Sequence, residues 1–280
     1  MSDPRDALDA IGQLPDAEID LADAALQLAR IDAPEADWHA ARAHLSELAR
    51  DAVALAGGLG GADLSARAGA LAGLFNGRHR YSGDTETYDD PANANLIHVI
   101  ERRRGLPVAL GILWLHCARA AGWGAHGIDF PGHFLVALEG PHNPALPRSS
   151  VLDPFAGGET MDARDLRALL KRIEGPKAEL RPGVLQPMSA RAVLLRLQNN
   201  VKARRLQAGA LDAALLCVED MLRIAPDAAA LWREAALIHQ RLGHVAAALR
   251  CFERFLALVP QGDAASRVRA AVEELRARLN

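Results

Sequence analysis

The chain has 280 residues, half of them hydrophobic, and a formal net charge of −3. This length suffices for one or two domains with a sizeable core. A slightly acidic chain lacks the basic surface that nucleic acid or an acidic lipid surface requires, so we expect neither as a partner.

The cysteines and the apolar segments narrow the class of protein further. Cys117, Cys217 and Cys251 form a sparse, odd set without CxxC spacing, which argues against a disulfide framework and against a zinc site. The N-terminus lacks the basic and apolar regions of a signal peptide, and the most apolar stretch, residues 105–118, is too short to cross a bilayer. We therefore expect a cytoplasmic protein that uses no metal and no cofactor.

The first half of the chain predicts helices separated by one polar loop. Apolar residues recur at helical spacing through residues 17–75. The segment 78–95 is polar and rich in turn formers, which predicts a loop. A short helix then ends at Gly105. The next helix, 107–121, begins with Pro107, whose missing N–H costs nothing in a first turn, and its almost continuous apolar run predicts burial on most sides.

The pattern then changes to that of β-strands. Residues 126–138 and 149–155 predict two strands. A helix over residues 162–175 follows, and the proline-rich segment 175–187 is the best linker in the chain.

The C-terminal part of the chain repeats itself at an offset of 34 residues. The segments "GALDAALLCVEDMLRIAP", from Gly209, and "GHVAAALRCFERFLALVP", from Gly243, share eight identical pairs. This period is typical of tetratricopeptide helix pairs. Cys217 and Cys251 occupy the same repeat position, which predicts that each is a small buried packing residue.

A histidine and an aspartate on successive predicted strands are two thirds of a catalytic triad. His133 stands at the entrance of the first strand, and Asp153 lies in the second. A cysteine hydrolase also needs a thiolate, best placed at a helix N-terminus, where the helix dipole lowers its pKa. A buried helix, a strand with His and a strand with Asp follow one another in this order in transglutaminase-like and papain-like enzymes.

Three motifs carry a resemblance to a known family. The segments "NLIHVIERRRGLPVALGILWLHCARAAGW", "GIDFPGHFLVAL" and "VLDPFAGG" resemble bacterial SirB-type transglutaminase-like proteins, and the likeness runs from about Leu71 to Pro260. The resemblance implies an α+β fold. It would consist of a helical N-terminal region (1–75), a papain-like core with a small antiparallel sheet (76–175) and C-terminal tetratricopeptide helices (188–280).

The nucleophile of a true transglutaminase has no counterpart here. Its position falls on Pro107 or Val108, and neither side chain can attack a carbonyl. Cys117 lies about ten residues further on, roughly 15 Å along a helix, in an apolar run where a thiol keeps a high pKa. Members of this family generally lack the cysteine as well, so the resemblance implies a site with His133 and Asp153 but no thiol.

Several interpretations of His133 stay open. It can form an architectural hydrogen bond with Asp153, line a ligand pocket, or serve a metal or a cysteine-free reaction. A metal set that includes His126 is weak, because residues seven apart along one strand point to opposite faces. Further candidate binding residues are Arg104, Asn95 and Phe134.

The sequence favours a non-enzymatic function. A degenerate transglutaminase-like domain with a short repeat array would act as a protein-interaction or scaffold module for a protein or peptide partner. The alternatives are an atypical, cysteine-independent enzyme of amide or peptide chemistry and a small-ligand sensor, both using the cleft at His133 and Asp153. The sequence predicts no particular partner and no oligomeric state.

Overall fold

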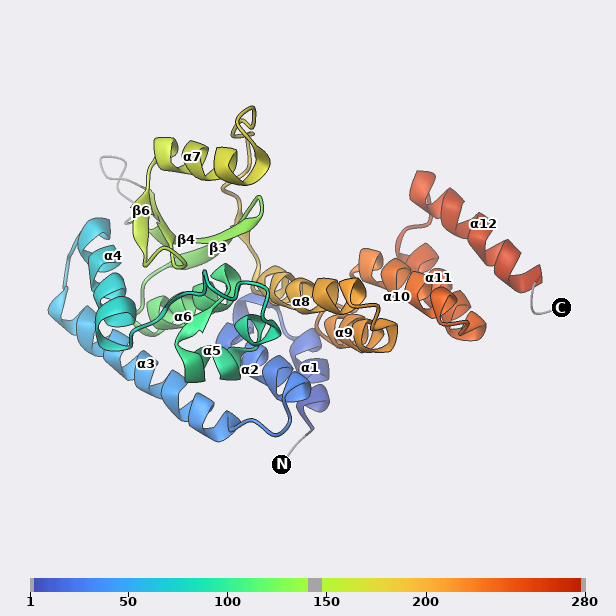
Figure 1. Cartoon of the computed structure of the whole chain (residues 1–280), viewed down its shortest axis with the longest axis horizontal. Helices are drawn as coiled ribbons and strands as arrows, with labels where there is room; N and C mark the ends of the chain where they lie inside the picture. The colour runs from blue at the N-terminus through green and yellow to red at the C-terminus, as the bar shows by residue number, and fades with distance from the viewer. Residues whose placement is uncertain (1–2, 141–147, 278–280) are drawn as a thin grey trace. The chain divides into compact units, whose positions relative to one another are not determined.

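The structure is a computed structural model that describes residues 3–140 and 148–277. It is mainly helical with a small sheet (Figure 1), so the predicted α+β fold is confirmed. The chain forms two compact units. The larger unit is Pro15–Leu197, and the smaller one joins the N-terminal segment up to Leu14 to the chain from Gln198 onward. The three-part division predicted from the sequence is not tested by this grouping and stays a prediction.

The helices of the larger unit surround one central helix, α6. They follow the sequence pattern, with Asp side chains capping α2, α3 and α4. Their bounds are η1 (Asp16–Glu18), α2 (Leu21–Asp32), α3 (Trp38–Gly58), α4 (Leu64–Ala72), the π-helical η2 (Gly73–Arg78), η3 (Pro91–Ala94), α5 (Leu96–Arg102), α6 (Pro107–Ala120) and α7 (Ala163–Glu174).

Helix α6 is buried along most of its length, as predicted. Eleven of its 14 residues are buried. Helices α2, α3 and α5 pack against it, and so do strands β3 (Ala125–Phe130) and β4 (His133–Glu139). Trp114 stacks on Phe75 with 4.9 Å between ring centroids. A Cβ atom at Gly111 would lie 2.3 Å from the Phe134 ring, so glycine lets α6 approach the sheet closely.

The sheets lie beside α6. In the described part of the chain the main sheet is antiparallel, with the order β6-β5-β4-β3-β7, and α7 packs on the face opposite to α6 (Figure 1). A short parallel pair joins β1 to β2, and β2 immediately precedes α6. The remaining strand bounds are β1 (Ser82–Gly83), β2 (Arg104–Gly105), β5 (Ser149–Asp153), β6 (Glu159–Met161) and β7 (Pro187–Met188).

The prediction of a single strand over residues 126–138 is wrong. This segment forms a hairpin, in which β3 and β4 pair from Ala125 opposite Leu138 to Phe130 opposite His133. Pro131 and Gly132 form the two-residue turn between these strands, and Gly132 adopts a φ of 64°, which favours glycine. His126 and His133 therefore lie on different strands.

The smaller unit consists of helices in the predicted repeat pattern. Neighbouring helices pack in chain order from α9 to α12. Cys217 and Cys251 are both buried, as predicted. The helices are α8 (Ala190–Gln207), of which the part from Gln198 onward belongs to this unit, α9 (Leu211–Ile224), α10 (Ala229–Arg241), α11 (Val245–Leu258) and α12 (Asp263–Ala277).

Helix α1 (Pro4–Gln13) lies within the helical N-terminal region that the resemblance implied, and it packs on α9. Arg5 forms a two-pronged pair with the buried carboxylate of Asp220, at 2.8 and 3.2 Å. Arg223 donates to Asp9 at 2.6 Å. A Cβ atom at Gly12 would lie 2.0 Å from the Arg223 carbonyl oxygen, so glycine is required at this contact. Charge pairs and close approach thus hold α1 on the first repeat.

Replacing Leu8, a fully buried side chain of α1, by Ala should lower the free energy of unfolding of the full chain. Lost burial and the remaining cavity predict a decrease of about 2–4 kcal/mol, measured by urea denaturation. Gln13→Ala, at an exposed position of the same helix, is the control and should change it by less than about 0.5 kcal/mol. An unchanged midpoint for Leu8→Ala would contradict the packing of α1.

Candidate functional site

His133 and Asp153 lie side by side on neighbouring strands. The register of β4 and β5 pairs Val136 with Leu152. Asp153 is therefore opposite Leu135, and His133 is its diagonal neighbour on the same face. His133 Nε2 lies 2.9 Å from Asp153 Oδ1. Because an ionised carboxylate only accepts, Nε2–H is the donor, and the hydrogen bond predicted between the two side chains is present.

The Asp153 carboxylate also organises the turn that follows β5. Its Oδ1 accepts from the main-chain N–H of Phe155 at 3.0 Å and of Ala156 at 3.3 Å. Gly158 N–H donates to the Asp153 carbonyl oxygen at 2.6 Å. The side chains of His133 and Asp153 are only 10% and 4% exposed. The aspartate thus has a structural task in addition to holding the imidazole ring.

Phe155 packs directly against the histidine. Its ring meets the His133 ring edge to face, with 5.9 Å between centroids, and meets Tyr88 at the same distance. A Cβ atom at Gly83 would lie 2.6 Å from the Phe155 ring. Gly83 belongs to β1, which pairs with β2 immediately before α6. An aromatic ring therefore contacts both His133 and the strand pair that leads into α6.

The N-terminus of α6 carries no reactive side chain. Its first turn is formed by Pro107, Val108, Ala109 and Leu110, all buried, and no side chain caps it. Cys117 lies deeper in the helix, with Sγ 3.7 Å from the Leu48 carbonyl oxygen. Burial raises the pKa of the Cys117 thiol to about 12, which leaves almost no thiolate at neutral pH.

Comparison with known proteins decides the family. The sequence pattern of the transglutaminase-like superfamily matches residues 39–199. The chain belongs to the transglutaminase-like superfamily. A tetratricopeptide-repeat pattern matches residues 201–273 of this transglutaminase-like chain, and the resemblance to SirB-type proteins with C-terminal repeats is thereby confirmed.

Bacterial relatives match much of the transglutaminase-like chain. A UPF0162 protein of Xylella fastidiosa strain Temecula1 is 33% identical over 70% of this chain and 69% of its own length. UPF0162 proteins of Vibrio cholerae and Pseudomonas aeruginosa are 31% and 32% identical, over 92% and 86% of this chain and 93% and 84% of their own lengths.

The predicted binding residues of the transglutaminase-like chain have other partners. Asn95 caps α5 through Oδ1, and its Nδ2 donates to the Ala29 carbonyl oxygen at 3.0 Å. Phe134 is 1% exposed and packs against Gly111 of α6. Arg104 pairs with Glu86 at 2.8 Å. None of these contacts joins the three residues to the His–Asp pair, and their part in binding is still only a prediction.

The loop that the sequence predicted between η2 and α5 is held by charge pairs. Arg102 bridges Asp84 and Asp90, each at 3.0 Å. Hydrogen bonds from the backbone and hydroxyl of Thr87 lower the pKa of Asp84 to about 2. The same loop carries Tyr88, so these pairs fix the aromatic side chain that packs on Phe155.

In the described residues, one cluster of side chains has possible metal-ligand atoms close enough to one another to hold a single ion. Atoms of His44, Glu47 and His79 lie within 4.8 Å of one another. However, Arg103 donates to His44 Nε2, and Asp51 accepts from His79 Nε2 at 2.8 Å. A divalent cation would have to stand beside the Arg103 guanidinium, and burial together with that charge lowers the pKa of His44. The group is better explained as a satisfied polar network.

The metal set that the sequence offered with His126 has another explanation. His126 bonds Glu139, at 3.0 Å.

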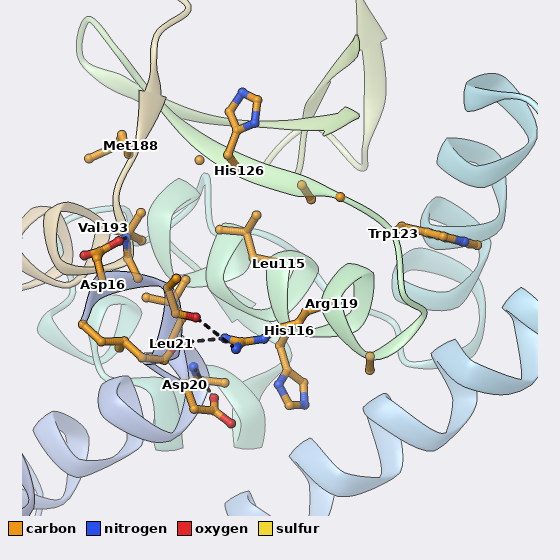
Figure 2. A pocket seen from close by; sticks show the side chains of 18 of the residues that line it. Asp16, Asp20, Leu21, Leu115, His116, Arg119, Trp123, His126, Met188 and Val193 are labelled. Carbon is orange, nitrogen blue, oxygen red and sulfur yellow. Dashed lines mark hydrogen bonds between the residues drawn. The ribbon is translucent and has the colours of Figure 1, made fainter. Parts of the chain in front are cut away.

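A cavity of about 610 Å³ opens elsewhere, beside the C-terminal half of α6 (Figure 2). Its lining includes Leu115, Arg119, Ala125, Met188 and Val193, but neither residue of the His–Asp pair. Sequence reasoning missed this cavity. A sequence signal at this place is the set of three glycines, Gly122, Gly124 and Gly127, within six residues.

None of the helices in the described ranges is long and apolar enough to cross a membrane.

Two substitutions of Asp153 separate the tasks of its carboxylate. Asp153→Asn keeps an oxygen that can accept from His133 and the turn, so it should cost about 0.5–1.5 kcal/mol of unfolding free energy. Asp153→Ala removes all three bonds and should cost about 2–4 kcal/mol. Thermal and urea denaturation of the full chain measure both. Equal, negligible losses would refute the structural role assigned to the carboxylate.

Proposed function

We propose that this transglutaminase-like chain is a non-catalytic, cytoplasmic protein-interaction module. The observation that carries the proposal is the first turn of α6, which begins with the buried residues Pro107 and Val108. The resemblance to transglutaminases implies the nucleophile at Pro107 or Val108. Both side chains are hydrocarbon, so neither can form an acyl intermediate. In this proposal, His133 and Asp153 are the remnant of a triad and now join two strands.

The surroundings of His133 also argue against a reaction that uses water in place of the thiol. A water molecule held for attack needs two or more polar partners. Besides the Asp153 carboxylate, which already accepts from Nε2–H, the ring of Phe155 packs on His133 and offers no hydrogen-bonding group. The ring itself is buried. These facts favour an architectural role over a cysteine-independent hydrolase.

The repeats supply the positive part of the proposal. Tetratricopeptide repeats generally mediate protein–protein interaction, and such a pattern spans residues 201–273. A protein or peptide partner is therefore the most economical ligand class. The match identifies no particular partner.

The full chain should not turn over amide or ester substrates of transglutaminases and thiol hydrolases. The test is to incubate wild type and Cys117→Ala with such substrates, with and without a thiol alkylator. Turnover lost on alkylation and in Cys117→Ala would contradict the proposal. Turnover that survives Cys117→Ala but disappears in His133→Ala would favour a cysteine-independent enzyme instead.

Cys117 should resist alkylation in the folded protein. With a pKa of about 12, its thiolate fraction at pH 8 is on the order of 10⁻⁴, and the side chain is buried. Mass spectrometry after iodoacetamide treatment should find Cys117 unmodified in the native protein and modified in urea. Rapid native labelling would show an accessible, activated thiol and would remove one support of the proposal.

A further inference from the structure

The cavity beside α6 lies where β7 leaves the sheet. Strand β7 pairs with β3 only at Gly127 and Ile128 in the described residues. Beyond this pairing the chain turns into α8, and Ala190 and Val193 of that helix line the cavity. The N-terminal part of β3, which includes Ala125, thus borders a cavity on the edge where a further strand would lie (Figure 2).

The register shows which main-chain groups of β3 point into this space. Glu139 N–H donates to the Gly124 carbonyl oxygen at 2.8 Å. In an antiparallel ladder, alternate residues direct both main-chain groups to the same side. Gly124 and His126 therefore face β4, whereas Ala125, Gly127 and Asp129 face the opposite edge. Gly127 is opposite Met188 of β7, so the N–H and C=O of Ala125 point past the end of β7.

The charged side chains of the lining are already engaged. Arg119 donates to the carbonyl oxygens of Ile19 and Ala17, at 2.8 and 3.4 Å (Figure 2). The Asp16 carboxylate accepts from the main-chain N–H groups of Ala190 and Arg191, at 2.8 and 2.9 Å. What the cavity offers to a ligand is therefore chiefly main-chain hydrogen bonding at β3 and apolar wall.

We propose that this cavity, the β3 groove, binds an extended peptide segment of a partner protein. The segment adds a strand to β3 by exchanging hydrogen bonds with Ala125. This addition to a sheet edge is an established mode of peptide recognition. The inference rests on the proposed function for the nature of the partner and adds where and how that partner binds.

The geometry also selects the side chain that enters the groove. Residues directly opposite each other in a ladder project to the same face. A Cβ atom at Gly127 would meet Phe134 and Val193. Ala125, two residues earlier on the strand, projects to the same face. His126 points to the other side of β3 (Figure 2). The peptide residue opposite Ala125 therefore directs its side chain towards Leu115 and Val193, so an aliphatic residue fits there.

The charges around the groove favour basic flanking residues. Two carboxylates, Asp16 and Asp20, line it together with one guanidinium, Arg119. Both carboxylates accept from main-chain N–H groups, which leaves their negative charge in place, and Arg191 lies 3.7 Å from Asp16. The volume of about 610 Å³ lies within the range of about 300–1,000 Å³ for ligand sites. A peptide with one aliphatic residue between basic ends is thus the matching probe.

The test uses the full, ¹⁵N-labelled chain and the probe acetyl-Lys-Thr-Leu-Thr-Lys-amide. Saturable amide-shift changes should centre on Ala125 and Val193. The same peptide with N-methyl-leucine lacks the N–H that Ala125 C=O would accept, and should bind about tenfold more weakly. A peptide with Glu in place of both Lys residues should also bind more weakly.

Two proline variants test the protein side of the same bonds. Ala125→Pro removes the N–H that faces the groove and leaves the ladder to β4 intact, so affinity should fall about tenfold. Asp129→Pro removes an N–H on the same edge outside the groove and should bind normally. The N-methyl peptide keeps the test valid should Ala125→Pro fold poorly.

Three results would overturn the inference. They are equal affinity for the methylated and unmethylated peptides, shift changes away from the groove or none at all, and self-association of the chain through β3, which would make a second copy the occupant. Each of these leaves the turnover assay unaffected, so the peptide groove can fail while the non-catalytic proposal stands.

Discussion

The rest of the larger unit depends on the burial of α6. A helix with eleven of 14 residues buried must be surrounded, because apolar area left in water costs roughly 25 cal/mol per Å². Helices from before it and strands from after it supply that cover. The close approach at Gly111 brings the helix onto Phe134 of the sheet. The same burial includes the first turn of the helix, Pro107 to Leu110, where no reactive side chain stands.

The contacts of the His–Asp pair give it a structural role that needs no thiol. The Asp153 carboxylate holds the turn after β5 as well as the imidazole of His133, and Phe155 on that turn packs on the ring. If the protein is non-catalytic, as we propose, these contacts keep a structural value when no reaction remains. The candidate for molecular recognition lies apart from them, at the edge of β3, where main-chain groups rather than a triad define the chemistry.

Much of the fold could be predicted from the sequence, because the signals were long or periodic. The apolar run of α6 and the 34-residue repeat are of this kind, and both are confirmed. Short-range signals failed where a turn interrupts one pattern: Pro131 and Gly132 divide the predicted strand into a hairpin. The packing of α1 on α9 could not be predicted, because Arg5 and its partner Asp220 lie 215 residues apart in the chain. The groove at Ala125 could not be predicted, because it depends on where β7 stops pairing with β3.

The predicted His133–Asp153 hydrogen bond is present, whereas the roles of these residues in function are still to be tested.

The central claim is that the His133 site is closed by packing rather than poised for chemistry. Diethyl pyrocarbonate modification of the native full chain, followed residue by residue with mass spectrometry, tests this most directly. His39 and His244 are exposed and serve as internal references. We expect His133 to react far more slowly than these two, and Phe155→Ala to raise its rate. Modification of His133 at the rate of the exposed histidines in the wild-type chain would contradict the claim.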